Sequence, residues 1–334
     1  MSKPTMQTIA DQLGVSRITV WKALSDRPGV SDALRERIAG KAQALGYAQT
    51  GEAVKPTRER TVAVVVSRPE SSSFWMQIIH HIAKELALHD ISLLYTYMPS
   101  AYKPGYALPA SLGYESVVGA IVLNIYSEEL LRMLAANPLP KVFLDTVPAL
   151  PFADLRGDLV LIEGRDLIRQ MTKRLLDSGR GRVGFIGDVG YAQTNTDRYQ
   201  GFLDAHELCG RKAERMYCMT EHIGLRSHYA EISDFLSGLQ TLPDAFVCAS
   251  DFIAHFVKRY LAESGREVPT GFVLTGFDNN AEYANVADQI TTVDVQTALL
   301  GKRLAREVMF RADYPSASYQ AAYVESEIIY REGV

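Results

Sequence analysis

The sequence has few cysteines and no long apolar run. Its three cysteines, Cys209, Cys218 and Cys248, are odd in number and have no CxxC spacing, which argues against a metal cluster and favours a reducing compartment. No segment approaches the roughly 20 apolar residues of a membrane-spanning helix, and the first residues are typical of a polar helix rather than a signal peptide. We therefore expect a cytoplasmic protein that does not associate with membranes.

Motifs of catalysis are also missing. Gly184, Gly187 and Gly190 match neither the GxGxxG pattern nor a phosphate-binding loop that ends in Lys-Ser/Thr. No HExxH motif and no Ser/His/Asp order appears in the chain. We expect no catalytic residue, no metal and no cofactor.

Charge is divided unevenly along the 334 residues. The net charge is −4, yet residues 1–60 carry +4 and the remaining residues carry −8. A basic end on an acidic body is typical of a protein whose first segment alone contacts a polyanion. The length predicts two or three folding units.

The stretch 16–24 predicts a helix with two different faces. At about 100° per residue, Ser16, Thr19, Val20, Ala23 and Leu24 share one small or apolar face. The opposite face combines two cations with two large apolar side chains: Arg17, Ile18, Trp21 and Lys22. A DNA major groove offers guanine acceptors to cations and thymine methyl groups to apolar contacts, so this face favours DNA recognition.

The flanking residues place this helix second in a helix-turn-helix. Thr5 is the expected N-cap of a first helix over 6–13, and Gly14 supplies the tight turn before Ser16 caps the second helix. A third helix is expected from Ser31 and Asp32 to about residue 45. Three short helices around one apolar centre are typical of a DNA-binding unit, and the alternative is a protein-interaction module.

From residue 61 onward the pattern changes to alternating strands and helices. The expected strands are nearly continuous aliphatic runs, typical of parallel strands buried on both faces. They cover 62–66, 91–95, 120–123, 141–144, 183–186, 245–249 and 272–275. The expected helices cover 74–89, 127–136, 197–208, 252–264 and 297–310. Two such series in tandem predict an α/β body of two doubly wound parallel-sheet subdomains with a cleft between them.

The chain resembles the lactose/galactose repressor (LacI/GalR) family over nearly its whole length. In the first fifty residues the resemblance rests on Thr8-Ile9-Ala10, Gly14-Val15-Ser16-Arg17-Ile18-Thr19-Val20, Val30-Ser31, Arg35-Glu36-Arg37 and Leu45-Gly46-Tyr47. In the body it rests on Arg198, Gly201-Phe202, Cys248-Ala249-Ser250-Asp251, Gly276-Phe277-Asp278 and Thr291-Thr292-Val293. The resemblance implies a periplasmic-binding-protein-like body whose chain crosses between the halves near 160, 291 and 323. The expected domains are a headpiece (1–47), a linker or hinge (48–60), an N-terminal subdomain (61–160 with 292–322) and a C-terminal subdomain (161–291 with 323–334).

The resemblance also implies roles for residues of the head and linker. Arg17, Ile18 and Lys22 fall where the family reads bases, while Thr5 and Ser16 fall where it anchors phosphates. Trp21 departs from the small residue usual in the family, and we expect it to contact DNA as well. In the linker Ala53 matches the family's hinge helix, but its minor-groove leucine is replaced by Pro56. Either Val54 takes the place of the leucine that wedges into the minor groove, or the standard hinge helix is missing, because proline disrupts a helix interior. We expect a linker that is disordered off DNA.

Polar and aromatic side chains follow the predicted strands, where ligands bind in open parallel sheets. Aromatic rings beside carboxylates, amides and an arginine are typical of a sugar pocket. The residues expected to bind an effector are Phe74, Trp75, Asn124, Asp145, Arg198, Ser250 and Asp278; the resemblance supports Arg198, Ser250 and Asp278 in particular. The alternative for the polar residues is that they cap the helices that follow the strands.

Two functions are consistent with these features. The first is a DNA-binding transcriptional regulator, a repressor, whose body binds a small effector such as a sugar and whose homodimer binds a near-palindromic double-stranded operator. The second is a two-lobed sugar-binding protein or a carbohydrate-modifying enzyme without a regulatory role. Residues 1–47 favour the regulator.

Overall fold

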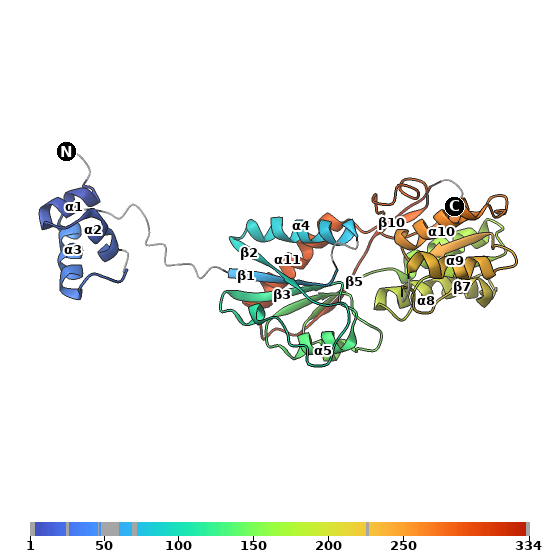
Figure 1. The fold of residues 1–334 in the computed structure, drawn as a ribbon, viewed down its shortest axis with the longest axis horizontal. Helices are drawn as coiled ribbons and strands as arrows, with labels where there is room; N and C mark the ends of the chain where they lie inside the picture. Colours follow the sequence, from blue (N-terminus) through green and yellow to red (C-terminus); the bar gives the residue numbers. More distant parts are fainter. Residues whose placement is uncertain are drawn as a thin grey trace. The chain divides into compact units, whose positions relative to one another are not determined.

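The fold is described from a computed structural model that covers residues 4–24, 27–45, 47, 60–68, 72–224 and 227–331. The chain divides into two compact units, residues 1–58 and 59–334; each is considered by itself (Figure 1). We call the first unit the head and the second the body.

The described residues of the head form three helices: α1 (Met6–Leu13), α2 (Arg17–Leu24) and α3 (Asp32–Ala44). Their apolar centre contains Ile9, Ala10, Val20, Ala23, Ile38 and Ala42. Gly14 ends α1 at φ 64°, a left-handed conformation that glycine adopts without strain. The three predicted helices are thus confirmed.

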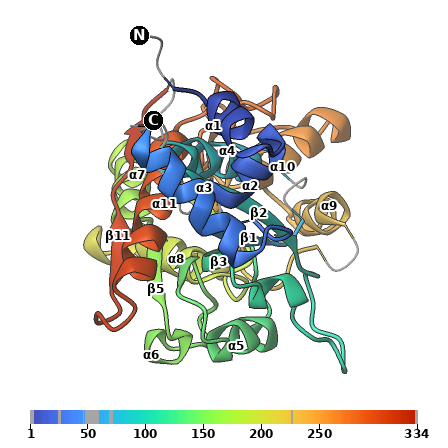
Figure 2. The ribbon, with the colours of Figure 1, turned by 90° about the vertical axis from the view of Figure 1, so that its left-hand side faces the viewer.

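The body begins with a parallel sheet, which has six strands in the described residues. Its strand order is β11-β5-β4-β3-β1-β2. In chain order the strands are β1 (Arg60–Val66), β2 (Ile91–Tyr97), β3 (Val117–Leu123), β4 (Lys141–Leu144), β5 (Asp158–Ile162) and β11 (Ala321–Val324). Helices α4 (Ser73–Ala87) and α11 (Thr297–Asp313) cover one face, while α5 (Glu128–Ala136) and the short α6 (Phe152–Leu155) cover the other (Figures 1 and 2). Alternate residues of β1 therefore join different apolar clusters, Val62, Val64 and Val66 on one side and Ala63 and Val65 on the other.

A second parallel sheet follows, with the order β7-β6-β8-β9 in the described residues. Its strands are β6 (Val183–Ile186), β7 (Cys218–Met219), β8 (Ala245–Cys248) and β9 (Val273–Thr275). Its helices are α7 (Arg165–Asp177), α8 (Gln193–Leu208), α9 (His228–Gly238) and α10 (Asp251–Ser264). Short 3-10 turns η2 (Ala110–Gly113) and η3 (Arg215–Tyr217) precede β3 and β7. We call the first sheet with its helices the N-lobe and the second sheet with its helices the C-lobe.

The described chain passes between the lobes at three places. The first passage lies between β5 and α7, and the second between β10 (Thr292–Asp294) and α11. The third joins β11 to β12 (Glu327–Ile329), which pairs antiparallel with β10. The domain boundary expected between residues 322 and 323 falls within β11, so the first sheet extends two residues further than that boundary. The other expected boundaries remain predictions.

Several elements differ from those predicted. Helix α8 begins at Gln193, four residues before the expected start, and β5, β7, α7 and α9 were not predicted at all. For α7 the signal is present in the sequence, since Leu167, Ile168, Met171 and Leu175 recur at helical spacing and all are buried. Strand β7 has two residues, too few for any periodicity to show.

A buried ion pair anchors the end of α11 to the first sheet. The Arg311 guanidinium donates to both carboxylate oxygens of Asp158, at 2.7 and 2.8 Å, and the two side chains are 2% and 1% exposed. Arg311 also donates to the carbonyl of Ser318 at 2.9 Å, in the segment that leads to β11. The pair therefore holds α11, β5 and the approach to β11 together.

Replacing Arg311 by methionine should lower the free energy of unfolding of the body by about 3–5 kcal/mol, because the buried charge of Asp158 would lose its counter-ion and keep only the hydrogen bond from the Gln320 amide. Chemical denaturation followed by circular dichroism measures this loss. The matched control is Arg60→Met, which removes the 2.7 Å Arg60–Asp313 pair, whose side chains are 40% and 52% exposed. The control should cost no more than about 1 kcal/mol. Equal losses in the two variants would contradict the anchoring role of Arg311.

Candidate functional site

The head presents the predicted DNA-reading face to solvent. Ile18 is 65% exposed and Trp21 is 44% exposed, although both are large apolar side chains. Arg17 is exposed beside them and Lys22 is half-buried. The structure therefore brings the four predicted reading residues together on one side of α2, away from the apolar centre that Val20 and Ala23 enter.

Thr5 and Ser16 both cap helices. The Thr5 hydroxyl accepts a hydrogen bond from the Thr8 amide at 3.3 Å, and the Ser16 hydroxyl accepts one from the Thr19 amide at 3.0 Å. Both residues are partly or fully exposed at helix N-termini, where free amides and the helix dipole attract anions. Their position is thus compatible with phosphate contacts.

Arg35 supports the other end of α2, a role that was not predicted. Its guanidinium donates to the carbonyls of Ala23 and Arg27, both at 2.9 Å. These carbonyls lie at and beyond the C-terminal end of α2, where backbone acceptors lack helical partners. The arginine thereby holds the end of α2 to α3. Its place in the sequence motif Arg35-Glu36-Arg37 was the available signal.

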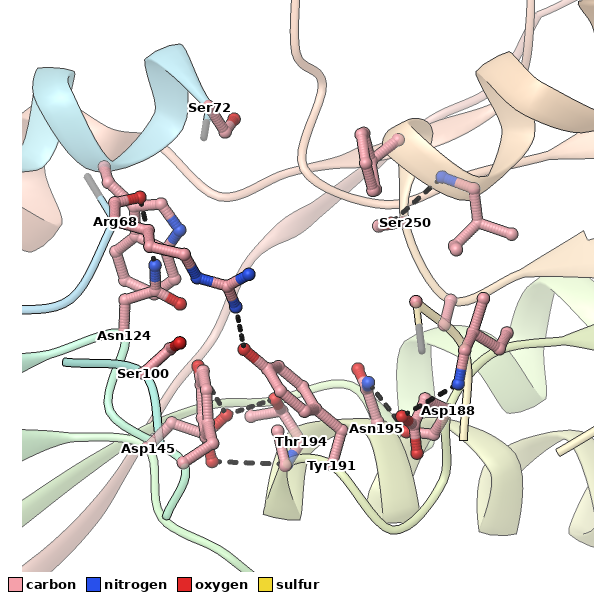
Figure 3. Close-up of a pocket in the computed structure, with 18 of the residues that line it drawn as sticks. Arg68, Ser72, Ser100, Asn124, Asp145, Asp188, Tyr191, Thr194, Asn195 and Ser250 are labelled. Atoms are coloured by element: carbon pink, nitrogen blue, oxygen red, sulfur yellow. Dashed lines mark hydrogen bonds between the residues drawn. The ribbon is translucent and has the colours of Figure 1, made fainter. Parts of the chain in front are cut away.

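In the body, a cavity of about 780 Å³ lies between the N-lobe and the C-lobe. All seven residues expected to bind an effector line this cavity: Phe74, Trp75, Asn124, Asp145, Arg198, Ser250 and Asp278. Figure 3 shows Ser72 at the start of α4 and Ser250 at the start of α10 on different walls. The carboxyl ends of the strands of both sheets therefore converge on one space, as the strand pattern predicts.

Arg198 is a buried cation in the cavity wall. It is 5% exposed, and its guanidinium carbon lies 3.6 Å from the centroid of the Phe277 ring. One Nη donates to the Ala249 carbonyl at 2.6 Å, and the other lies 3.8 Å from Asp278 Oδ1. The backbone of Gly164 passes so close that an added Cβ would lie 2.8 Å from the Arg198 Cγ. The arginine is held in one orientation with room for a further hydrogen-bonding partner.

Asp278 and Asp145 are carboxyls in strained backbone positions. Their φ angles are 104° and 70°, in the left-handed region that residues other than glycine rarely adopt. Burial raises the pKa of Asp278 to about 7, against the opposing effect of the Arg198 guanidinium. Burial also raises the pKa of Asp145, which accepts hydrogen bonds from the Thr194 hydroxyl at 2.5 Å and the Thr146 amide at 2.8 Å. Thr194 belongs to the C-lobe, so Asp145 also links the lobes (Figure 3).

The remaining expected residues divide between lining and supporting roles. Asn124 donates from its amide to the Ser67 carbonyl at 2.7 Å, which holds together the loops that follow β1 and β3. Ser250 caps α10 through the Ile253 amide at 3.3 Å, the alternative considered for such residues. Phe74 and Trp75 pack edge to face, with ring centroids 5.1 Å apart, and form an aromatic wall on the N-lobe.

The cavity lining also includes residues outside those seven. The Arg68 guanidinium reaches across the cavity to the Tyr191 hydroxyl at 3.5 Å (Figure 3). The ring centroids of Tyr191 and Tyr126 lie 4.5 Å apart. Asp188 accepts from His222 Nδ1 at 2.6 Å at the opposite end of the lining. The segments around Arg68, Tyr191 and His222 lie in loops without periodicity, so no sequence pattern predicted them.

Comparisons with known proteins agree with this architecture. A protein-family model described as "Periplasmic binding protein-like domain" matches residues 172–334. The transcriptional repressor PurR of Mannheimia succiniciproducens is 25% identical over 99% of this chain and 98% of the relative, and the regulator CelR of Thermobifida fusca is 24% identical over the same shares. A LacI-family regulator from Silicibacter pomeroyi is similar in structure over 98% of both chains, with 25% identity and a TM-score of 0.60. The chain is thus similar over nearly its whole length to transcriptional regulators, one of which is named as a member of the LacI family.

Two further solved structures have the same fold as this chain. A CelR–cellobiose complex has a TM-score of 0.70 and 24% identity, and the similarity covers 99% of this chain and all of the other. A lac repressor dimer bound to operator has a TM-score of 0.69 and 17% identity over 99% of both chains. The relatives in these comparisons are named as transcriptional regulators or repressors.

No helix within the described ranges is long and apolar enough to cross a membrane. No group of three or more His, Cys, Asp or Glu side chains in the same ranges is arranged to hold a metal ion.

The raised pKa of Asp278 predicts how its replacement changes stability with pH. In the folded protein this carboxyl holds its proton up to about pH 7, whereas in the unfolded chain it loses the proton near pH 3.8. The folded state thus binds more protons between these values, and the contribution of Asp278 to stability falls as the pH rises from about 4 to 7. Asp278→Asn should remove this loss. Relative to the unmodified protein, the free energy of unfolding of the variant should therefore rise by about 1–3 kcal/mol between pH 4 and pH 7. We expect a value near the lower end, because a fifth of the Asp278 side chain is exposed.

Thermal or chemical unfolding at pH 4, 5.5 and 7 measures the effect. The matched control is Asp90→Asn, at an exposed carboxylate. A difference between Asp278→Asn and the unmodified protein that stays constant over this pH range would contradict the prediction.

Proposed function

We propose that this chain is a LacI-family regulator and a sequence-specific repressor, that its body binds a neutral, hydroxyl-rich small molecule such as a sugar, and that this effector changes operator affinity. The observation that carries the proposal is the lining of the cavity. The buried Arg198 and the partly buried Asp278 line the same cavity as the aromatic pair Phe74 and Trp75. Sugars need both, because their C–H faces stack on rings while their hydroxyls donate and accept hydrogen bonds.

The charges of the cavity favour a neutral ligand over an anion. Two arginines, Arg68 and Arg198, line it against five acidic residues: Asp145, Asp188, Asp278, Glu128 and Glu129. Burial raises the pKa of Asp145 and of Asp278, and the anionic form of an added carboxylate or phosphate would meet the same unfavourable desolvation. A hydroxyl donates to a carboxylate and accepts from a guanidinium, so a polyol satisfies both kinds of group.

The head supports the DNA-binding part of the proposal. Its exposed Arg17, Ile18 and Trp21 form a surface that a major groove complements. A single head of three short helices buries little surface, and specific binding at a near-palindromic double-stranded operator needs two. We therefore propose a homodimer, in which α4 and α11 of the body are candidate contact elements. Both expose apolar side chains, Met76 at 49% and Leu299 at 58%.

The linker remains a prediction. Ala53, Val54 and Pro56 lie outside the described residues. We propose that discrimination between operators depends more on the four reading residues of α2 than on a minor-groove wedge at Val54, because proline limits any helix in this segment.

Replacement of Arg17 by alanine should weaken binding to the preferred operator by about 1–3 kcal/mol and relax base preference, because a bidentate contact to guanine is lost. Ser16→Ala should instead weaken binding to all sequences alike. Fluorescence anisotropy with the selected operator and with mismatched DNA measures both effects. Arg37→Ala, at an exposed position of α3, is the control. Unchanged operator affinity in Arg17→Ala would remove Arg17 from the reading face.

A panel of monosaccharides, disaccharides and nucleosides, tested by thermal unfolding of the full chain, should contain a stabilising ligand. A ligand at about 100 times its Kd adds roughly 2.7 kcal/mol. Arg198→Met retains the apolar contact with Phe277 but loses the donors, so it should abolish this ligand-dependent shift and leave operator binding in place. Calorimetry that finds full affinity for the stabilising ligand in Arg198→Met would contradict the assignment of Arg198, and a stabilising ligand found only among anions would contradict the proposed ligand class.

A further inference from the structure

The start of α4 in the N-lobe is hydrogen-bonded to a loop of the C-lobe. The Ser73 amide donates to Glu282 Oε2 at 2.7 Å, and the Ser73 hydroxyl donates to Asn280 Oδ1 at 2.9 Å. The Asn280 side-chain amide donates to the Ser72 hydroxyl at 3.0 Å. One polar contact between the lobes thus joins Ser72 and Ser73 of the N-lobe to Asn280 and Glu282 of the C-lobe, which lie more than 200 positions later in the sequence.

This contact completes the cap of a helix. The first amides of a helix have no partner within it, and an acceptor at the N-terminus stabilises them. Ser72 supplies one acceptor from its own lobe, to the Phe74 amide at 3.2 Å. Glu282 supplies a second one, and because it is a carboxylate it also interacts favourably with the helix dipole. Helix α4 has both of these acceptors only while the two lobes are in contact.

The loop that carries Asn280 and Glu282 is itself held firmly. Asp251 accepts a hydrogen bond from the Asn280 amide at 2.8 Å, and Asn280 Oδ1 accepts one from the Glu282 amide at 3.0 Å. Asp278, which lines the cavity, belongs to the same loop. The helix on the other side of the contact carries Phe74 and Trp75. The contact therefore joins the polar wall of the cavity directly to its aromatic wall.

We infer that Asn280 and Glu282 are positioning residues that hold the lobes closed by capping α4 across the cleft. They set the separation between the aromatic wall at Phe74 and Trp75 and the polar wall at Asp278. Opening of the lobes removes the second cap of α4, so the closed state gains the stability of that cap. The inference depends on the proposed function only for the role of the cavity in effector binding.

A backbone hydrogen bond at a separate contact between the lobes can be used to detect opening of the lobes. The Gln193 amide, at the start of α8 in the C-lobe, donates to the Thr146 carbonyl of the N-lobe at 2.8 Å. Its hydrogen exchange becomes faster when the lobes separate. Neither Gln193 nor Thr146 contacts Glu282 in the hydrogen bonds of the described residues, so the report is independent of the mutated site.

The test is hydrogen exchange of the full chain, without DNA or effector, resolved at the Gln193 amide. Glu282→Ala should accelerate this exchange by about three- to tenfold, the effect that loss of a helix cap has on an opening equilibrium. Glu282→Gln keeps an acceptor without the charge and should give a smaller acceleration. Glu267→Ala, which removes an exposed carboxylate elsewhere in the C-lobe, should leave the rate unchanged.

Two results would overturn the inference. Faster exchange at the start of α4 with an unchanged rate at Gln193 would make the contact a local cap. Equal acceleration at Gln193 and at the core amides of β3 would show general destabilisation instead of lobe opening. Since neither DNA nor an effector is present, both results are distinguishable from a failure of the proposed function.

Discussion

The buried carboxylate of Asp251 holds together the segments on which the cavity depends. Its own amide donates to the Phe277 carbonyl, and its two oxygens accept from the Asn280 amide at 2.8 Å and the Thr292 hydroxyl at 2.7 Å. The start of α10, the loop that carries Asp278 and the strand β10 that leads back to the N-lobe are thus tied to one group. An added Cβ at Gly276 would lie 2.0 Å from Asp251 Oδ1, so only glycine leaves the space that this arrangement needs. Burial raises the pKa of Asp251 to about 6, which indicates how far the group is removed from water.

Backbone conformations of high energy are concentrated in the loops near the cavity. Asn124, Asp145, Asp278 and Asn279 all follow strands and all have positive φ angles. Such conformations each cost on the order of 1–3 kcal/mol and persist only where the surrounding structure enforces them. Here the parallel strands end at a common edge, and the turns that follow direct polar side chains into the space between the lobes. The body thereby gives up some stability to present hydrogen-bonding groups that its own side chains only partly satisfy.

The two lobes are joined in two different ways. Covalent continuity at three places in the described chain limits their relative motion to a hinge, while side-chain contacts across the cleft favour one position of that hinge. Asp145 with Thr194 lies at one contact, and Asn280 and Glu282 with the start of α4 lie at another. Because each contact involves a residue of the cavity wall or its neighbour, a ligand that enters the cavity acts on the same groups that hold the lobes together. This is the physical requirement for a ligand to change the balance between two states.

The sequence by itself determined the features that arise from local patterns. The three helices of the head follow from apolar spacing with caps at Thr5, Gly14 and Ser16, and the exposed position of Trp21 follows from the helical wheel. The buried strands follow from aliphatic runs. The polar and aromatic residues that follow those strands, together with Arg198, which the resemblance supported, all line one cavity. Motif resemblance added the LacI/GalR family, and the comparisons found similar transcriptional regulators over nearly the whole chain.

Only the tertiary structure decided which residues meet across the cleft. Arg68 and Tyr191 are separated by more than 100 positions, and Ser73 and Glu282 by more than 200. Their pairing depends on the relative position of two independently packed sheets, which no local periodicity encodes. The same holds for the supporting role of Asn124 and for the raised pKa of Asp278, since both result from what surrounds the side chain. Local spacing specifies a helix or a strand, whereas burial and charge at a site depend on parts of the chain that come together only on folding.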